Sequence, residues 1–587
     1  MKIYTIFYLI PIFVISQAQM IVYIVILFNV RYNMFNLQET EGFVMNKLSE
    51  MFLNIKDGET VLLKKDEIYH VRQDDSFESE GFYCSNTAKL HENPNGLRRT
   101  AVYLNGKKNV TIDGNGATIM VHGKMTPLLF YGCENITVRN LVIDYACPTM
   151  SEFRVVSNND GDCILEINKE CLYKIEDNCI VWHGETGEDG AYYWQDSYIG
   201  NRRHNKIYDP ATQMCRDFRR DDLEFELIEE LAPCRIHAVL RKKDADLPAG
   251  CVFQTRNIIR DQTGSMFERC RNLRFENLRI RFMHGLGMVS QFCENVSFTN
   301  CDLTPAEGRT VASTADFFQF SGCRGDIVID NCKAQGAHDD YVNVHGTHLR
   351  IVSADENEKS LVVRFMHAES WGFQAFEAGD ELEFIKWDTL IPYASSTVVS
   401  YERINDTDIK LILSDFVDDI EIEKDVVENV TWTPNLYVRN CSFGPTSGRG
   451  ILCTTRGEVI IENNSFRNLW GPALLLEDDC NFWFESGLTK EIIFRNNVVE
   501  NCEYRVMWEG APSIRYTPKV MNENSEEFVH GRLVLKGNTF LKPHFASHLF
   551  LLEYLGEAVV EDNVFDSSYE IKTICVGKII DRNNTVK

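Results

Sequence analysis

The segment Asn272-Leu-Arg-Phe-Glu-Asn277-Leu278 is followed, 23 residues later, by Asn295-Val-Ser-Phe-Thr-Asn300-Cys301. Apolar and polar residues alternate within each copy, as in a β-strand that buries one face. The Asn at each end tolerates the left-handed backbone of a tight turn, and its amide can bond to the copy above or below. A repeat of this length holds about three short strands with their turns. The two segments therefore predict stacked β coils.

The same unit recurs along most of the chain. Repetition of one small structural unit is typical of a solenoid, and the leucine spacing of a leucine-rich repeat is absent. No stretch alternates helix and strand, which disfavours a barrel or doubly wound sheet with helices. We predict an all-β chain that forms a right-handed parallel β-helix. The further copies are Asn135–Leu141, Asp326–Cys332, Val459–Asn464, Ile492–Asn497, Leu533–Asn538, Val559–Asn563 and Ile579–Asn584.

Two gaps interrupt the repeat, and both contain β-rich segments without the Asn unit, such as Val181-Trp-His183 and Asp408–Leu413. We predict a small antiparallel, barrel-like β insertion in each gap. The expected organisation is an N-terminal part of the β-helix at 41–149, an insertion at 150–262, central coils at 263–348, a second insertion at 349–432 and a C-terminal part at 433–587.

Composition excludes some partners. The chain has a net charge of −26, so it repels phosphate backbones, and we expect no nucleic-acid partner. Its 19 cysteines include no CxxC pair, so a zinc site is not expected. Several cysteines recur at one position of the repeat, which predicts buried thiols rather than disulfides. These are Cys133, Cys270, Cys293 and Cys323, and again Cys301, Cys332, Cys441 and Cys502.

The N-terminus carries no charge from Ile3 to Val30. Its first half, up to Ser16-Gln-Ala18, is typical of a signal peptide with a small-residue cleavage site. We therefore expect export to the periplasm, cell envelope or exterior, and leave residues 1–40 out of the fold. One alternative is an anchor helix, because about 20 apolar residues span a bilayer and would associate the chain with a membrane. The other is a true start at Met34 or Met45.

The densest polar region runs from Arg309 to His348 and contains Asp316 and the pair Asp339-Asp340. Asp316 and Asp339 are 23 residues apart, so we expect them to stack on adjacent coils about 5 Å apart. Neighbouring residues of a strand point to opposite faces, so Asp339 and Asp340 share one groove only if they lie in a turn or bulge. Three clustered carboxyl groups raise the pKa of at least one, which gives the acid and base that glycoside hydrolysis requires. An ordinary acidic turn or a Ca²⁺ ligand set would use the same residue types.

Other residues are candidates for binding a sugar. Trp483 could stack on a sugar face, while Arg449 and Glu485 could bond hydroxyl groups. The further candidate substrate-binding residues are His284, Arg309, Asn343 and His345.

The chain resembles glycoside hydrolase family 110, the exo-α-1,3-galactosidases, from about residue 55 onward. The resemblance rests on many short blocks in the same order. It departs from the family pattern at Gln319, where a His is expected, and at Tyr341, where smaller residues are usual. The blocks are Ile112–Gly116, Val121–Gly123, Asp144 with Pro148, His284–Met288, Ala315-Asp316, Cys323–Gly325, Asp339-Asp340, Asn343–Gly346, Arg449–Leu452 and Asn481–Gly487.

The resemblance implies an inverting hydrolase without metal or cofactor. Its substrate would be a glycan with terminal α-1,3-linked galactose, including blood-group B structures. Asp339 would be the general acid, and Asp316 and Asp340 would hold and activate the water. The sequence leaves open whether a fucose branch is required or a linear glycan suffices.

Three other functions remain open on the residues alone. A β-helix polysaccharide lyase would need a Ca²⁺-holding acid cluster and a basic residue. A polygalacturonase-like hydrolase would need a cationic groove for galacturonate. A glycan-binding β-helix without activity would not need three carboxylates at coil spacing.

Overall fold

The computed structural model describes residues 45–197, 203–218, 223–504, 512–541 and 548–587. The signal, anchor and start at Met34 predicted for the N-terminus lie outside these residues. Within the described ranges, no helix is long and apolar enough to cross a membrane. The short helix α2 (Lys47–Leu53) begins after Asn46, whose side chain accepts a hydrogen bond from the Ser49 N–H, as expected for an N-cap.

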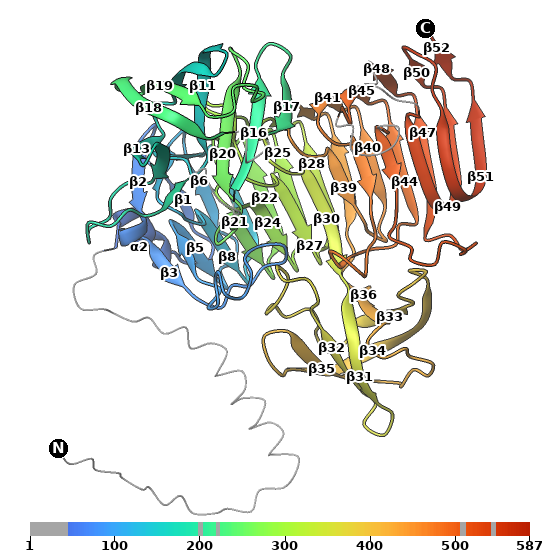
Figure 1. Cartoon of the computed structure of the whole chain (residues 1–587). Coiled ribbons are helices and arrows are strands. Elements are labelled where there is room, and N and C mark those ends of the chain that lie inside the picture. The colour runs from blue at the N-terminus through green and yellow to red at the C-terminus, as the bar shows by residue number, and fades with distance from the viewer. Residues whose placement is uncertain (1–44, 198–202, 219–222, 505–511, 542–547) are drawn as a thin grey trace, which may run out of the picture. The chain divides into compact units, whose positions relative to one another are not determined.

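Parallel strands form successive coils, which confirms the predicted β-helix (Figure 1). A coil contributes one strand to each of three ladders, and the first ladder carries the candidate site. Its strands are β5 (Val102–Asn105), β8 (Leu128–Tyr131), β21 (Thr263–Glu268), β24 (Leu286–Gln291), β27 (Phe318–Ser321), β30 (Val342–Thr347), β39 (Ile451–Cys453), β42 (Leu474–Leu476), β46 (Ile514–Tyr516), β49 (Phe550–Glu561) and β51 (Ile571–Arg582).

The second ladder also ends in the long strands β49 and β51. Before them it contains β1 (Thr60–Leu62), β6 (Thr111–Asp113), β9 (Glu134–Arg139), β22 (Arg271–Glu276), β25 (Glu294–Thr299), β28 (Arg324–Asp330), β37 (Asn435–Arg439), β40 (Val459–Glu462), β44 (Glu491–Arg495) and β47 (His530–Lys536).

The third ladder forms a separate twelve-stranded sheet. Its strands are β2 (Ile68–Arg72), β7 (Thr118–His122), β10 (Val142–Tyr145), β23 (Arg279–Ile280), β26 (Asp302–Leu303), β29 (Lys333–Ala334), β38 (Ser442–Phe443), β41 (Ser465–Leu469), β45 (Val498–Cys502), β48 (Thr539–Leu541), β50 (Val564–Phe565) and β52 (Thr585–Val586).

Stacked apolar side chains fill the interior of the coils. The rings of Phe275 and Phe298 stack with centroids 4.6 Å apart, and Phe318 follows at 4.6 Å from Phe298. All 19 cysteines are free thiols, and all but Cys234 and Cys575 are buried, as predicted. Removing this apolar surface from water stabilises the coils.

The Asn residues of the repeat form ladders along the coils. Asn272 has a φ of 56° and Asn295 a φ of 58°, both left-handed, and the Asn295 amide donates to Asn272 Oδ1 at 2.9 Å. Toward the C-terminus a second, buried ladder links Asn497, Asn538 and Asn563 through bonds of 3.2 and 3.0 Å. The predicted role of Asn in joining neighbouring coils is therefore observed.

The first insertion lies between β10 and β21. Its main sheet is antiparallel and has the order β17-β16-β20-β11-β12-β19-β18. In chain order these strands are β11 (Ser151–Asn159), β12 (Asp162–Ile167), β16 (Arg203–Asp209), β17 (Met214–Asp217), β18 (Phe225–Ala232), β19 (Arg235–Leu240) and β20 (Val252–Asn257). A small sheet adds β13 (Leu172–Glu176), β14 (Cys179–His183) and β15 (Gln195–Ser197).

The second insertion lies between β30 and β37 and is a closed antiparallel barrel. Figure 1 shows its strands in yellow and gold, leaving the stack of parallel strands after β30. They are β31 (Leu349–Asp355), β32 (Ser360–Arg364), β33 (Glu381–Ile385), β34 (Pro392–Arg403), β35 (Asp408–Leu413) and β36 (Val426–Asn429). Each predicted gap thus contains antiparallel β structure.

Candidate active site

The ends of two coils bring the acidic residues together. Strands β27 and β30 pair in parallel with Phe318 opposite Val342. Asp316 and Asp340 each precede their strand by two residues, so these two stack on adjacent coils, and the Asp340 N–H donates to Asp316 Oδ1 at 3.2 Å. The expected stacking of Asp316 on Asp339 is wrong by one residue. The coil from β27 to β30 spans 24 residues, since Ser313 pairs with Ala337 and Phe318 with Val342, and the prediction used the 23-residue step of another coil.

Asp339 lies outside the strands, in the bend before β30, and reaches the same place from the side. Oxygen atoms from its carboxylate and from those of Asp316 and Asp340 lie within 4.8 Å of one another. The Asp339 side chain is 31% exposed and that of Asp340 only 1%. One carboxylate therefore faces the opening, while Asp340 and the 3%-exposed Asp316 lie deep.

A glycine permits this close approach of two coils. A Cβ added to Gly448 would lie 2.1 Å from the Asp339 carbonyl oxygen. The next residue is Arg449, so the glycine lets an arginine of the following coil reach the acidic cluster.

Two guanidinium groups surround the acids. Arg260 Nη2 bonds Asp339 Oδ2 at 2.9 Å, and Arg449 Nη2 lies 3.5 Å from Asp339 Oδ1. Arg449 Nε also donates to Asp340 Oδ1 at 2.5 Å. The other oxygen of Asp340 is buried and has no hydrogen-bond partner among the described residues.

Burial and these charges give the three carboxyl groups different pKa values. Burial, with Asp339 and Asp340 beside it, raises the pKa of Asp316 well above its ordinary value. Burial also raises the pKa of Asp340 to about 7, although Arg449 opposes it. For Asp339, Arg260 and Arg449 outweigh burial and lower the pKa. These shifts favour a proton on the deep pair rather than on Asp339.

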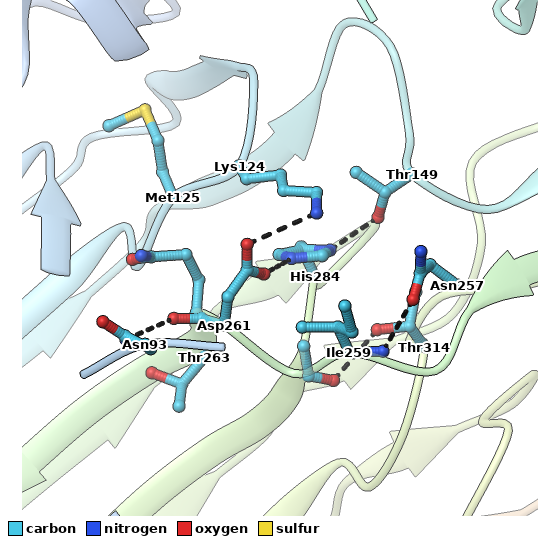
Figure 2. Close-up of polar contacts among 12 residues, drawn as sticks. Asn93, Lys124, Met125, Thr149, Asn257, Ile259, Asp261, Thr263, His284 and Thr314 are labelled. Carbon is cyan, nitrogen blue, oxygen red and sulfur yellow. Dashed lines mark hydrogen bonds and ion pairs between the residues drawn. The ribbon is translucent and has the colours of Figure 1, made fainter. Parts of the chain in front are cut away.

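A polar network surrounds Asp261 (Figure 2), the residue that follows Arg260 in the chain. The Asp261 carboxylate accepts from Lys124 Nζ at 3.3 Å and bonds His284 Nε2 at 2.7 Å. His284 Nδ1 lies 2.8 Å from Thr149 Oγ1. This network fixes the segment that carries Arg260.

A cavity opens over the three carboxylates, and two predicted substrate-binding residues, His284 and Arg309, do not line it. His284 is 4% exposed and belongs to the Asp261 network. Arg309 bonds Asp144 at 2.6 Å, the Tyr145 carbonyl at 3.0 Å, and Glu170. Arg309 was predicted from the polar segment that begins with it and His284 from the family resemblance, and both form ion pairs away from the carboxylates.

A cavity of about 500 Å³ opens over the carboxylates, a size typical of small-molecule sites. Of the predicted binding residues, Asn343, Arg449, Trp483 and Glu485 line it. Trp483 is 47% exposed, and its ring centroid lies 4.3 Å from that of His367. An exposed aromatic face beside carboxylates suits a sugar.

Glu485 enters the site through an antiparallel pairing with β30. Its strand β43 (Glu485–Ser486) places Glu485 opposite Thr347. The Glu485 carboxylate accepts from Asn86 Nδ2 at 2.5 Å and from Asn343 Nδ2 at 3.4 Å. His345 does not line the cavity: it is 3% exposed and bonds the Gly346 carbonyl at 2.6 Å and Gln319 at 3.1 Å.

The two departures from the family pattern have structural positions. Gln319 is fully buried and contacts His345. Tyr341 points into the core, stacks on Phe317, and donates to the Gly444 carbonyl at 2.7 Å. Neither residue lines the cavity.

Several cavity residues were not predicted. Asn86 comes from a loop far upstream, and Arg260 from the end of the first insertion, with no motif around either. Glu477, Asp479 and Lys519 also line the cavity. In the sequence, only the acidic run Glu477–Asp479 could have indicated some of these residues. In the structure, Asp479 accepts hydrogen bonds from the Asn481 and Phe482 N–H groups and so holds the loop that presents Trp483.

The three carboxylates are close enough to share a divalent cation. However, Arg260 bonds Asp339 and Arg449 bonds Asp340, so a divalent cation would add its charge next to two guanidinium groups. The arrangement provides protonated and ionised carboxyl groups in one sugar-sized cavity, as acid/base hydrolysis of a glycoside requires.

Comparison with known proteins places this site in a family. The family model for the GLAA-B beta-barrel domain II matches residues 360–427, within the closed barrel. The chain is 36% identical to α-1,3-galactosidase A of Akkermansia muciniphila over 81% of this chain and 77% of that protein. It is 35% identical to α-1,3-galactosidase A of Bacteroides fragilis over 78% and 74%, and 29% identical to α-1,3-galactosidase B of Phocaeicola vulgatus over 92% and 88%. The chain therefore belongs to glycoside hydrolase family 110, the family of the α-1,3-galactosidases, and is a glycoside hydrolase.

Proposed function

We propose that this protein is an exo-acting α-galactosidase that removes terminal α-1,3-linked galactose from neutral glycans, with inversion and without a metal. The observation that carries the proposal is the cavity over Asp316, Asp339 and Asp340, in a chain whose relatives bear the name α-1,3-galactosidase. Blood-group B structures and linear Gal-α-1,3-Gal glycans are the proposed substrates.

The depth of each carboxyl group supports the division of roles. In an exo-acting enzyme the leaving group lies at the mouth of the galactose cavity, and the attacking water lies on the opposite face of C1. Asp339 is the exposed carboxyl group, and Asp316 and Asp340 are the deep ones. We therefore assign Asp339 as the acid, and Asp316 and Asp340 as the groups that hold and deprotonate the water.

In the proposed reaction, a deep carboxylate takes a proton from water while the water oxygen bonds to C1. The bond between C1 and the glycosidic oxygen breaks, and that oxygen receives the Asp339 proton. Galactose leaves as the β anomer.

The electrostatics of the site oppose Asp339 as the acid, because Arg260 and Arg449 lower the pKa of Asp339. We assign Asp339 as the acid by its exposed position, because the proton donor must reach the glycosidic oxygen. The proton that the deep pair holds must then pass to Asp339 when substrate displaces water from the site.

The distance between the carboxyl groups does not by itself predict inversion. Inverting pairs lie about 6.5 to 9.5 Å apart, and retaining pairs about 5 Å apart. The observed limit of 4.8 Å between oxygen atoms alone favours a retaining pair. The hydrogen-bonded pair Asp316–Asp340 instead suits a shared water, and the sequence resemblance implies inversion.

The test is to incubate the protein with Gal-α-1,3-Gal and with the blood-group B trisaccharide, and to follow the released galactose by proton NMR. Early signals of β-galactose, unaffected by EDTA, are expected from both. Early α-galactose would refute inversion, loss of activity in EDTA would refute metal independence, and no galactose from either would refute the proposed activity.

A further inference from the structure

One loop of the second insertion reaches the galactose cavity. It spans residues 365–380, between β32 and β33 of the barrel, within the segment that matches the GLAA-B beta-barrel domain II. At one point its His367 ring lies against Trp483, with centroids 4.3 Å apart. At another, the buried Ser370 bonds Asn86, which lines the cavity. The barrel therefore contacts two residues of the cavity wall without lining the cavity at these points.

Ser370 and Asn86 are joined by a pair of hydrogen bonds. The Asn86 N–H donates to Ser370 Oγ at 3.2 Å, and the Ser370 hydroxyl donates to Asn86 Oδ1 at 3.0 Å. Because Oδ1 is held toward the barrel, the amide nitrogen of Asn86 faces the other way. It donates to Glu485 Oε1 at 2.5 Å. The Ser370 hydroxyl thus determines which end of the Asn86 amide meets Glu485.

The backbone of Asn86 serves the acidic cluster as well. Its φ is 60°, in the left-handed region that Asn tolerates better than most residues. Its carbonyl accepts from Arg260 Nη1 at 3.1 Å, and the other terminal nitrogen of this guanidinium bonds Asp339 at 2.9 Å. Every polar group of Asn86 is therefore used, in a residue that is only 4% exposed.

Further bonds hold the two loops together. The Thr87 N–H donates to the Glu369 carbonyl at 3.1 Å, and Trp371 Nε1 donates to the Ala88 carbonyl at 2.9 Å. Glu369 and Trp371 are the two neighbours of Ser370 in the chain, so the barrel loop is fixed on both sides of the serine. The position of its hydroxyl group is therefore well determined.

We propose that Ser370 is a positioning residue of the galactose cavity: it orients the Asn86 amide, which holds the Glu485 carboxylate where it accepts from a galactose hydroxyl group. The inference rests on the proposed function and gives the barrel insertion a part in sugar binding. Ser370 itself does not touch the sugar. The coils supply the three carboxyl groups of the reaction, and the barrel fixes a group that binds the galactose.

The test measures kcat and KM on Gal-α-1,3-Gal. Ser370→Ala is expected to raise KM about tenfold, because Glu485 loses its fixed position and with it a hydrogen bond to the sugar. The value of kcat should stay within about threefold, since this bond forms with substrate and transition state alike. A smaller folded fraction would instead lower kcat and leave KM unchanged. Ser370→Cys keeps the shape with only a weak S–H donor, should act in the same direction, and serves if thermal melts show Ser370→Ala unfolded.

A double variant shows whether Ser370 acts through Asn86. Asn86→Gly removes the amide and keeps the left-handed backbone accessible. It should raise KM at least tenfold, and adding Ser370→Ala should then change KM by less than about threefold. Ser396→Ala is the matched control. Ser396 is another buried serine of the barrel, its hydroxyl donates to the Asp415 carbonyl at 2.8 Å, and its loss should leave KM unchanged.

An unchanged KM in the folded Ser370 variants would overturn this role. So would a fall in kcat alone, or effects of Asn86→Gly and Ser370→Ala that multiply in the double variant. Wild-type protein distinguishes this failure from that of the proposed function. If it releases galactose from the disaccharide, only the role of Ser370 is at stake; if it releases none, the proposed function fails and this inference with it.

Discussion

Asp316 and Asp340 occupy the same position on two adjacent coils, joined by a hydrogen bond of 3.2 Å from the Asp340 N–H to Asp316 Oδ1. Their carboxyl groups lie deep, and Asp339 stands beside them at the opening. Regular coil stacking therefore builds a pair of like groups, and the residue just before Asp340 adds a third with different surroundings.

The first prediction separates the acid from the groups that hold water. Asp339→Asn should lower kcat on Gal-α-1,3-Gal by about 10²- to 10⁴-fold, because the glycosidic oxygen is then not protonated. On 2,4-dinitrophenyl α-galactoside, whose leaving group needs no proton, the loss should be at least tenfold smaller. Asp340→Asn, which disables water activation, should lose activity on both substrates alike.

Steady-state kinetics of the two variants and wild type provide the measurement. Retention of more than about a tenth of wild-type kcat by Asp339→Asn on the disaccharide would exclude this residue as the acid. If the activated substrate instead restored the activity of Asp340→Asn alone, Asp340 would be the acid, in agreement with its raised pKa.

The second prediction concerns pH. Acid/base hydrolysis needs one proton and one ionised carboxylate within the cluster. Because burial raises the pKa of Asp340 to about 7, the cluster keeps this proton at mildly acidic pH and loses it as the pH rises through that value. We expect kcat/KM to fall on the alkaline side with an apparent pKa of about 7 or above. A decline already complete by pH 5, as for isolated carboxyl groups, would contradict this, provided that thermal melts show the protein folded throughout.

The third prediction tests the close approach of two coils. In Gly448→Ala the new Cβ would meet the Asp339 carbonyl at 2.1 Å, so the bend that carries Asp339 must shift. Misplacement of this kind can cost up to about 10²-fold in rate. We expect kcat/KM to fall at least tenfold. Gly444→Ala, on the same coil, is the control, since its nearest neighbour would lie at an ordinary 3.6 Å; equal activities of the two variants would show that the contact is unimportant.

The sequence predicts the repeating part of the structure well. Alternating residues and terminal Asn report a local pattern that each coil repeats, so the β-helix and the stacked thiols could be predicted from segments such as Asn295–Cys301. Register could not, since the Asp316–Asp340 alignment depends on a coil of 24 residues, whereas Asn272 and Asn295 are 23 apart. Asn86 and Arg260 could not be predicted either, because only folding brings these distant loops to the acidic cluster.

The last prediction concerns the buried Asn ladder. Asn538 is fully buried; its amide donates to the Phe494 carbonyl at 2.9 Å and to Asn563 at 3.0 Å, and its oxygen accepts from the Asn497 N–H at 2.9 Å. Asn538→Ala would leave these groups buried without partners, at about 1 to 3 kcal/mol each. Since neighbouring coils stabilise one another, the loss should lower the stability of the C-terminal coils as a unit.

We expect the apparent free energy of unfolding in urea to fall by about 2 kcal/mol or more. Asn524→Ala, in an exposed turn, is the control and should stay within about 0.5 kcal/mol of wild type. Equal stability of the two variants would mean that the ladder satisfies polar groups without holding the coils together, and that the apolar stack alone joins the C-terminal coils.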